Sequence, residues 1–236
     1  MKIGLFTDCH YCRSKLGGNR DSVGSYEKIK ASMEAFKKEN VDICFCLGDL
    51  TDHAPDDTKE SVEGCFMEIM ELIRSFDIPF YLVPGNHDYL VMKAEELKEK
   101  TGYMIPPYTV STEKYDFIVL DGNYRSNMVR FDVAGVLWTD SNLPPDQMEY
   151  LKRALSDSQR ACIVLIHENL DPCVHESHIV KNAQAIREII RDSGKVRLVL
   201  QGHYHRGGDS VIDGIPYQTL PAMCEHGDGY YRILNI

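Results

Sequence analysis

The chain has 236 residues, a length at which one sizeable α/β domain buries a proper core, and we expect residues 1–236 to form a single domain. Hydrophobic residues make up 43% and charged residues 26%, which is ordinary for a water-soluble globular protein without disordered tracts. Twenty-six Lys and Arg against 36 Asp and Glu give a net charge of −10. That charge opposes the binding of long nucleic acids and disfavours a nuclease.

The N-terminal residues lack the apolar core and cleavage site of a signal peptide, and no apolar run approaches membrane-spanning length. We therefore expect a cytoplasmic protein with no membrane partner, in which the eight cysteines stay reduced. Cys9 and Cys12 form a C-x-x-C pair, but no second pair completes a structural zinc site. We interpret Cys9 as a neighbour of the polar site described below.

The first part of the chain alternates apolar runs with amphipathic segments. The runs at 2–7, 42–47 and 79–83 have the continuous apolar character of buried strands. Between them, apolar residues within 26–40 and 62–76 recur at three- and four-residue steps, which is typical of amphipathic helices. A β-α-β-α-β order predicts right-handed crossovers and a largely parallel sheet covered by helices.

The second part of the chain continues this alternation and ends in short strands. The predicted strands are 115–120, 161–166 and 196–200, and the predicted helices are 147–155 and 179–191. Short runs at 209–213, 216–220 and 230–234, separated by Gly and Pro, predict antiparallel hairpins. The glycine-containing segment 11–25 is predicted to be a loop, and it follows the first polar motif directly.

Five polar clusters each stand at the end of a predicted strand. They are Asp8-Cys9-His10, Gly48-Asp49, Gly85-Asn86-His87-Asp88, His167 and Gly202-His203-Tyr204-His205. Because ligands bind outside the carboxyl ends of parallel strands, we expect these clusters to converge. In extended backbone, a spacing of two residues would point Asp8 and His10 the same way. The glycines that precede the ligands predict tight turns and close backbone approach.

The residue types in these clusters indicate metal binding. The candidate ligands are Asp8, His10, Asp49, Asn86, His167, His203 and His205. These are too many for one four- to six-coordinate ion, so we expect two divalent ions, and the mixed oxygen and nitrogen set favours Mn, Fe or Zn. A shared carboxylate can hold two ions roughly 3.5–4 Å apart, the separation used in phosphoryl displacement.

The order D-x-H, G-D, G-N-H-D, H, G-H-x-H runs from Asp8 to His205 and resembles the calcineurin-like metallophosphoesterases, including their bacterial cyclic-nucleotide phosphodiesterase branch. The resemblance implies an α/β fold, a four-layer α/β/β/α sandwich with two mixed sheets. The implied ligands are Asp8, His10 and His205 for one ion, Asn86, His167 and His203 for the other, and Asp49 between them.

The resemblance also implies roles in catalysis. His87 would approach the substrate together with Asn86, stabilise phosphoryl charge and protonate the leaving oxygen. Asp88 would either hold the His87 imidazole in the required tautomer or cap a helix. The implied mechanism is attack on phosphorus by a hydroxide formed on the two metal ions, without a covalent enzyme intermediate.

The expected function is hydrolysis of a small phosphodiester, with a nucleotide among the candidate substrates. Family members that grip a monoester dianion carry Arg beside the ligands, and no Arg adjoins Asn86 or His167 in the sequence. Arg206, which follows His205, is a candidate substrate-binding residue and keeps a phosphomonoesterase as the alternative. A catalytically silent binding scaffold is a further alternative, although such a chain would have lost ligands and every ligand position is filled here.

Other residues near the clusters have weaker signals. Tyr11, Tyr89 and Tyr204 flank the clusters and are candidates to stack on a nucleobase, and Asn169 is a candidate substrate contact. The run Val136-Leu137-Trp138 and the helix after it are interpreted as structural support. The histidines outside the clusters, which we place at the surface or in a substrate pocket, are His53, His175, His178 and His226.

Overall fold

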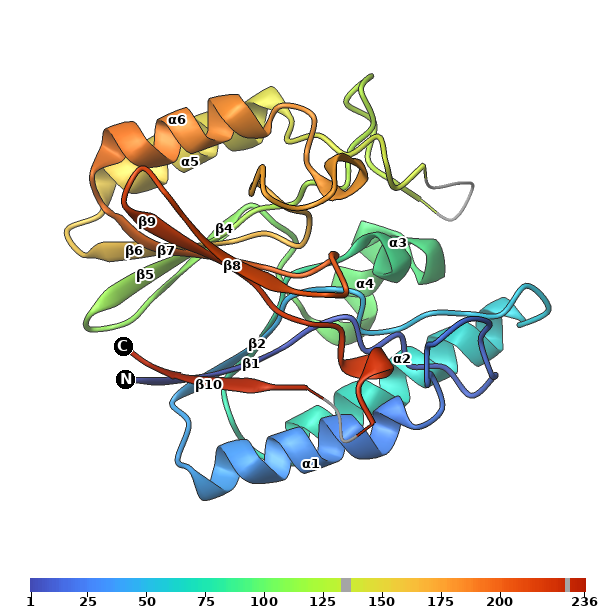
Figure 1. The fold of residues 1–236 in the computed structure, drawn as a ribbon. Coiled ribbons are helices and arrows are strands. Elements are labelled where there is room, and N and C mark those ends of the chain that lie inside the picture. Colours follow the sequence, from blue (N-terminus) through green and yellow to red (C-terminus); the bar gives the residue numbers. More distant parts are fainter. Residues whose placement is uncertain (133–136, 228–229) are drawn as a thin grey trace.

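The computed structural model describes residues 1–132, 137–227 and 230–236. Two β-sheets face each other, and α-helices cover the outer face of each sheet (Figure 1). Both sheets contain parallel and antiparallel strand pairs. The α/β/β/α sandwich with two mixed sheets that the sequence predicts is therefore confirmed.

The first sheet has the strand order β10-β1-β2-β3. Strands β1 (Lys2–Phe6), β2 (Ile43–Cys46) and β3 (Phe80–Leu82) are parallel, and the crossover helices are α1 (Ser25–Lys38) and α2 (Lys59–Arg74). The predicted β-α-β-α-β order is confirmed. The prediction that 230–234 forms a hairpin with its predecessors is wrong, because β10 (Arg232–Asn235) crosses to this sheet and pairs antiparallel with the open edge of β1.

The second sheet has the order β4-β5-β6-β7-β9-β8. Its strands are β4 (Tyr108–Ser111), β5 (Tyr115–Val119), β6 (Ala161–Leu165), β7 (Val196–Gln201), β8 (Gly208–Ile212) and β9 (Ile215–Thr219). Strands β8 and β9 form the expected antiparallel hairpin, and α5 (Pro145–Asp157) and α6 (Ala183–Ser193) cover the sheet (Figure 1). Helix α6 begins later than predicted, because 179–182 form a bridge and a turn that hydrogen-bond to neighbouring loops.

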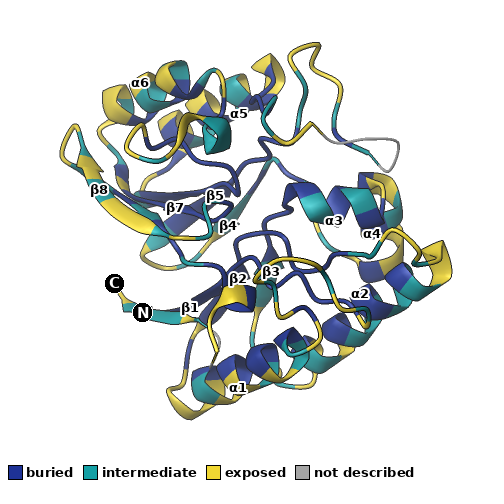
Figure 2. Cartoon of the chain, turned by 45° about the vertical axis from the view of Figure 1, so that its right-hand side comes forward, coloured by how far each residue is buried: buried dark blue, intermediate teal, exposed yellow. Residues whose placement is uncertain are grey.

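Three apolar clusters fill the spaces between the layers. The strands alternate between them: Phe117 lies in the cluster between the two sheets, while Ile118 lies in the cluster under α5 and α6. In the same way Leu5 faces the other sheet and Phe6 faces α1 and α2. Because both faces of the central strands are buried over most of their length, these strands are mostly apolar, as Figure 2 shows by their burial. Asp116 in β5 and Arg197 in β7 are polar exceptions.

Two short helices, α3 (Asn86–Val91) and α4 (Ala94–Thr101), follow β3 and were not predicted as separate elements. Helix α3 places Asn86 and His87 in its first turn, directly beyond the end of a parallel strand. Among the described residues, no helix is both long enough and apolar enough to cross a membrane.

Candidate metal centre and active site

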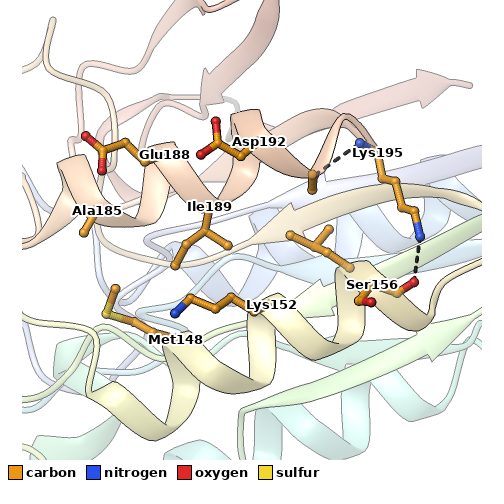
Figure 3. A pocket seen from close by; sticks show the side chains of 10 residues that line it. Met148, Lys152, Ser156, Ala185, Glu188, Ile189, Asp192 and Lys195 are labelled. Atoms are coloured by element: carbon orange, nitrogen blue, oxygen red, sulfur yellow. Dashed lines mark hydrogen bonds between the residues drawn. The ribbon is translucent and has the colours of Figure 1, made fainter.

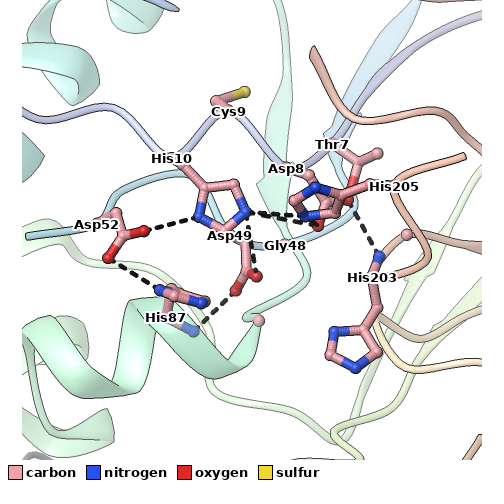
Figure 4. Close-up of polar contacts among 12 residues, drawn as sticks. Thr7, Asp8, Cys9, His10, Gly48, Asp49, Asp52, His87, His203 and His205 are labelled. Carbon is pink, nitrogen blue, oxygen red and sulfur yellow. Dashed lines mark hydrogen bonds and ion pairs between the residues drawn. The ribbon is translucent and has the colours of Figure 1, made fainter. Parts of the chain in front are cut away.

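The carboxyl ends of parallel strands from both sheets meet at one place and bring the predicted ligands together. Figure 4 shows five of them: Asp8, His10, Asp49, His203 and His205. The ligands come from the loops after β1 (Asp8 and His10), β2 (Asp49), β6 (His167) and β7 (His203 and His205), and from the first turn of α3 (Asn86). Each sheet supplies part of the set, so the site forms only where the two sheets pack against each other.

One group of ligand atoms surrounds His10. The Nε2 atoms of His10 and His205 lie 3.2 Å apart. The carboxylate oxygens around these two nitrogens lie at distances of 3.4 Å or more. Asp8 Oδ1 lies 3.8 Å from His10 Nε2 and 3.4 Å from His205 Nε2. Asp49 Oδ2 lies 3.6 Å from His10 Nε2. The Sγ atom of Cys224 also falls within 4.8 Å of the two histidine nitrogens.

A second group surrounds His167 and shares one atom with the first. The same Asp49 Oδ2 lies 3.4 Å from His167 Nε2. Ligand atoms of Asp49, His167 and His203 all fall within 4.8 Å of one another. A single carboxylate oxygen therefore faces both groups, which is the arrangement required of a bridging ligand.

The residues present fit metal ions, because buried polar atoms in both groups have no hydrogen-bond partner among the described residues. These atoms are Asp8 Oδ1, Asn86 Oδ1, His167 Nε2 and His203 Nε2. An unsatisfied buried acceptor costs roughly 1–3 kcal/mol, which a coordinated cation would remove. Burial lowers the pKa of His10 and of His203, so both imidazoles are neutral and each offers a lone pair.

Three of the four ligand histidines are held by hydrogen bonds from their other ring nitrogen. His10 Nδ1 lies 3.0 Å from Asp52 Oδ2, His167 Nδ1 lies 2.7 Å from the Leu47 carbonyl oxygen, and His205 Nδ1 lies 2.6 Å from Glu225 Oε1. Such contacts fix the tautomer and direct Nε2 toward the metal. Asp8 is fixed similarly, since its Oδ2 accepts hydrogen bonds from Thr7 Oγ1 and the His203 amide.

Asp52, which the sequence motifs did not single out, joins the metal group to His87. Its Oδ1 lies 2.9 Å from His87 Nδ1, and its Oδ2 contacts His10 Nδ1 (Figure 4). The same Oδ2 accepts a hydrogen bond from Arg20 Nη1. Burial raises the pKa of the Asp52 carboxyl, but the hydrogen bonds from His10 and His87 outweigh it and hold the pKa well below its usual range. Asp52 is thus ionised and positions two functional imidazoles.

Asp88 accepts hydrogen bonds from backbone amides and not from the His87 imidazole. Asp88 Oδ2 accepts from the Gly85 amide and Oδ1 from the Thr51 amide, so the carboxyl caps α3 and holds the loop after β2. Burial and the charge of Asp49 raise the pKa of Asp88 to about 7. The helix-capping interpretation is therefore the correct one, and Asp52 occupies the place proposed for Asp88.

The ligand loops adopt backbone conformations that the sequence analysis did not anticipate. Asp8, His10, Asp49 and His203 have positive φ angles of 50°, 46°, 51° and 64°, so the expected extended backbone at Asp8 and His10 is wrong. Conformations of this kind cost about 1–3 kcal/mol each and persist where surrounding structure imposes them. Here the amides of Asp8 and His10 donate to the Gly48 and Asp49 carbonyl oxygens and link the two loops.

Two glycines are required by close approach. Gly48 has φ +108°, and a Cβ atom there would lie 2.2 Å from His167 Nδ1. A Cβ atom on Gly85 would lie 2.2 Å from Asp49 Oδ1. The predicted role of these glycines in backbone approach is confirmed.

A cavity of about 230 Å³ opens above the ligands. It is lined by Arg20, Asp49, Asn86, His87, Trp138, His178, His203 and His205. We call the seven predicted ligands the metal floor, and we call Arg20, Trp138 and His178 the cavity wall. Arg20 comes from the predicted loop after β1, Trp138 from a turn before α5, and His178 from the end of a short 3-10 helix, η1 (Glu176–His178).

Several sequence candidates lie away from this cavity. Arg206 is exposed and is not part of the lining, so Arg20 is the arginine that the fold brings to the site. Tyr11 and Tyr89 are buried and donate hydrogen bonds to Glu68 and Asp121, which excludes them as stacking surfaces. Asn169 is also buried and instead links Gly202 to Thr219.

A larger groove of about 520 Å³ lies between α5 and α6 on the outer surface (Figure 3). Met148, Ile189 and the stems of Lys152 and Lys195 line it, and it contains none of the predicted ligands.

Cys9 and Cys12 are buried free thiols, and Cys9 Sγ contacts Met223 Sδ. Cys9 is therefore a packed neighbour of the site.

Two facing mixed sheets with paired groups of potential metal ligands at their common edge agree with the metallophosphoesterase architecture expected from the sequence motifs. The sequence profile of the calcineurin-like phosphoesterases matches residues 1–207, and the chain belongs to this family. The enzyme class predicted from the sequence is thereby confirmed.

Relatives and solved structures agree with this assignment. The chain is 24% identical over 232 residues to the 3',5'-cyclic adenosine monophosphate phosphodiesterase CpdA of Haemophilus influenzae, covering 95% of this chain and 77% of that protein. It is 23% identical to a probable cyclic nucleotide phosphodiesterase of Coxiella burnetii, covering 95% and 84%. A dimetal phosphatase from Danio rerio has the same fold, with a TM-score of 0.82, 17% identity, and coverage of 98% and 91%.

Proposed function

We propose that the chain hydrolyses a small phosphodiester, with cyclic nucleotides as the leading substrate class, and that residues 1–236 act as one catalytic domain in the cytoplasm. The observation that carries this proposal is the position of Asp49 Oδ2, within 3.6 Å of His10 Nε2 and 3.4 Å of His167 Nε2. The names of the relatives support a cyclic nucleotide as substrate.

Two divalent ions, Mn, Fe or Zn, would occupy the two ligand groups. Asp8, His10 and His205 would hold one, Asn86, His167 and His203 the other, and Asp49 would contact both. When bound, the ions would lower the pKa of a water molecule and neutralise charge on the phosphoryl oxygens. The mixed carboxylate, amide and imidazole set suits first-row divalent ions.

His87 is the proposed general acid. Burial lowers its pKa, but the charge of Asp49 and the contact with Asp52 outweigh burial and raise the pKa above the ordinary value. A raised pKa favours the protonated imidazole, which can give its proton to the leaving oxygen. Asp52 keeps the ring in place through Nδ1, so the other nitrogen is the one available for transfer.

Arg20 is the proposed partner of the phosphoryl oxygens, in place of Arg206. It lines the cavity beside His87, and Asp52 holds its guanidinium at 2.9 Å. Arg20 also favours the second candidate function, a phosphomonoesterase, because a guanidinium can grip the extra negative charge of a monoester. The scaffold alternative predicts neither metal binding nor turnover.

The decisive assay compares bis-p-nitrophenyl phosphate and cyclic AMP with p-nitrophenyl phosphate, using protein loaded with Mn²⁺. We expect a higher kcat/KM for the diesters. A higher kcat/KM for the monoester would establish the phosphatase alternative. Turnover of neither class by protein that binds no metal would establish the scaffold alternative.

A further inference from the structure

The cavity wall contains a large apolar side chain that the chemistry at the metal floor does not use. Trp138 is the single tryptophan of the chain, and 39% of its surface is exposed although it lines the catalytic cavity. An indole left open to water is stabilised when a planar group covers it. The exposure also argues against the interpretation of Trp138 as structural support alone.

The indole belongs to a set of rings that reaches the metal floor. Its ring centroid lies 5.0 Å from that of His178 and 5.6 Å from that of the ligand His203. His178 in turn lies 5.1 Å from both His203 and Tyr204. A planar group in contact with Trp138 would therefore lie close to His203, a ligand of the proposed second ion. The phosphate would bind at that ion.

The rest of the cavity lining has the opposite character. Arg20 carries positive charge, and the floor beneath it would hold two cations. The cavity thus pairs an anion-binding part with an aromatic part in about 230 Å³. A ligand that satisfies both parts carries a phosphate at one end and a flat apolar group at the other.

We propose that Trp138 and His178 form a stacking surface for a planar heterocyclic or aromatic group attached to the scissile phosphate. The class of substrate is then a phosphate ester with a nucleobase or a similar ring, and the wall selects it against esters with aliphatic groups. This inference rests on the proposed function, since it names the group that the phosphodiester carries.

Because Trp138 is the only tryptophan, its fluorescence reports on this surface directly. The Zn²⁺-loaded protein is titrated with AMP and with ribose 5-phosphate, which has the same phosphate and sugar but no base. We expect AMP to change the fluorescence saturably and to bind about 5-fold to 150-fold more tightly, the range for one stacked base. Equal affinities with no AMP-specific change would overturn the proposal.

Kinetics of Trp138→Leu with bis-p-nitrophenyl phosphate provide a second test. We expect KM to rise by about 5-fold to 150-fold while kcat changes little, and Trp138→Phe to retain most of the affinity because it keeps a ring. Leu137→Ala is the matched control, since Leu137 is 61% exposed and lies outside the lining. An unchanged KM in Trp138→Leu, with wild-type thermal stability, would contradict stacking.

The two proposals fail in different ways. If the wild-type protein hydrolyses diesters but binds AMP and ribose 5-phosphate equally well, the proposal of a stacking surface is wrong and the proposed function stands. If the protein hydrolyses no ester but AMP alone perturbs Trp138, the stacking surface stands and the proposed function is wrong.

Discussion

The metal floor and the cavity wall are built in different ways. Floor residues such as Asp8 and Asp49 are at most 1% exposed, stand at strand ends, and have hydrogen bonds that fix their orientation. Wall residues such as Trp138 come from loops and keep much of their surface open. Rigid placement suits a reaction that needs fixed charges, whereas loop side chains can be changed to suit a substrate. The floor therefore sets the reaction, and the wall sets which ester is used.

The largest effect is expected next to the floor, at His87. Replacing it in His87→Asn should lower kcat for cyclic AMP by about 10²- to 10⁴-fold, because the leaving alkoxide would depart without a proton. The loss should be smaller for bis-p-nitrophenyl phosphate, since p-nitrophenolate is a good leaving group. Metal content should stay at the wild-type level. Equal losses for both substrates would refute the general-acid role.

An intermediate effect is expected for Asp52→Asn. The change weakens the contacts to His10 and His87 at once, and contacts of this kind are worth about 10- to 100-fold in metal affinity or activity. Metal affinity, measured by titration, and kcat should both fall. A residue that positioned His87 alone would lower kcat but leave the metal affinity unchanged. A matched control is Asp56→Asn, because Asp56 is exposed. Activity within two-fold of wild type would show that Asp52 has no positioning role.

The sequence identified residues that the fold brings together at the floor, because their signal is local. Strand ends, the short clusters and the glycines before them are readable one segment at a time, and the resemblance supplied the order of the blocks. Asp52 was missed although it stands only three residues after Asp49, because nothing in the sequence shows that its carboxylate turns toward His10 and His87. The choice between Asp88 and Asp52 depends on side-chain direction, which spacing does not determine.

The wall was missed for a different reason. Arg20, Trp138 and His178 lie in three segments that are far apart in the sequence, and only the packing of both sheets brings them to one cavity. The sequence pointed instead to Arg206 and Tyr89, which stand near ligands in the chain but do not line the cavity. Likewise β10 looked like a hairpin strand, because the open edge of β1 is not visible in a sequence pattern.

A smaller effect than at the floor is expected in the wall. Arg20→Gln should raise KM by roughly ten-fold for either ester, because one charged hydrogen bond to the phosphoryl group is lost. Arg206→Gln should leave KM unchanged, since Arg206 is exposed and outside the cavity lining. Steady-state kinetics of the two variants test this directly. A raised KM in Arg206→Gln together with an unchanged KM in Arg20→Gln would show that the phosphate binds near Arg206 instead.

The smallest effect on turnover is expected for Asp88→Asn. Its carboxylate accepts from two buried backbone amides, so the free energy of unfolding should fall by roughly 1–3 kcal/mol. The value of kcat at a temperature where the variant is folded should stay within a few-fold of wild type. Thermal unfolding and initial rates on the same sample provide the measurement. A large loss of kcat without a loss of stability would show that Asp88 acts in catalysis, as the first sequence interpretation proposed.

The most direct test of the central claim is metal analysis of the purified protein and of Asp49→Asn, measured together with hydrolysis of bis-p-nitrophenyl phosphate. Asp49 Oδ2 faces both ligand groups, so we expect about two ions per wild-type chain, fewer in the variant, and no detectable hydrolysis by the variant. Full activity of wild-type protein carrying one ion or none, or of Asp49→Asn, would contradict the account.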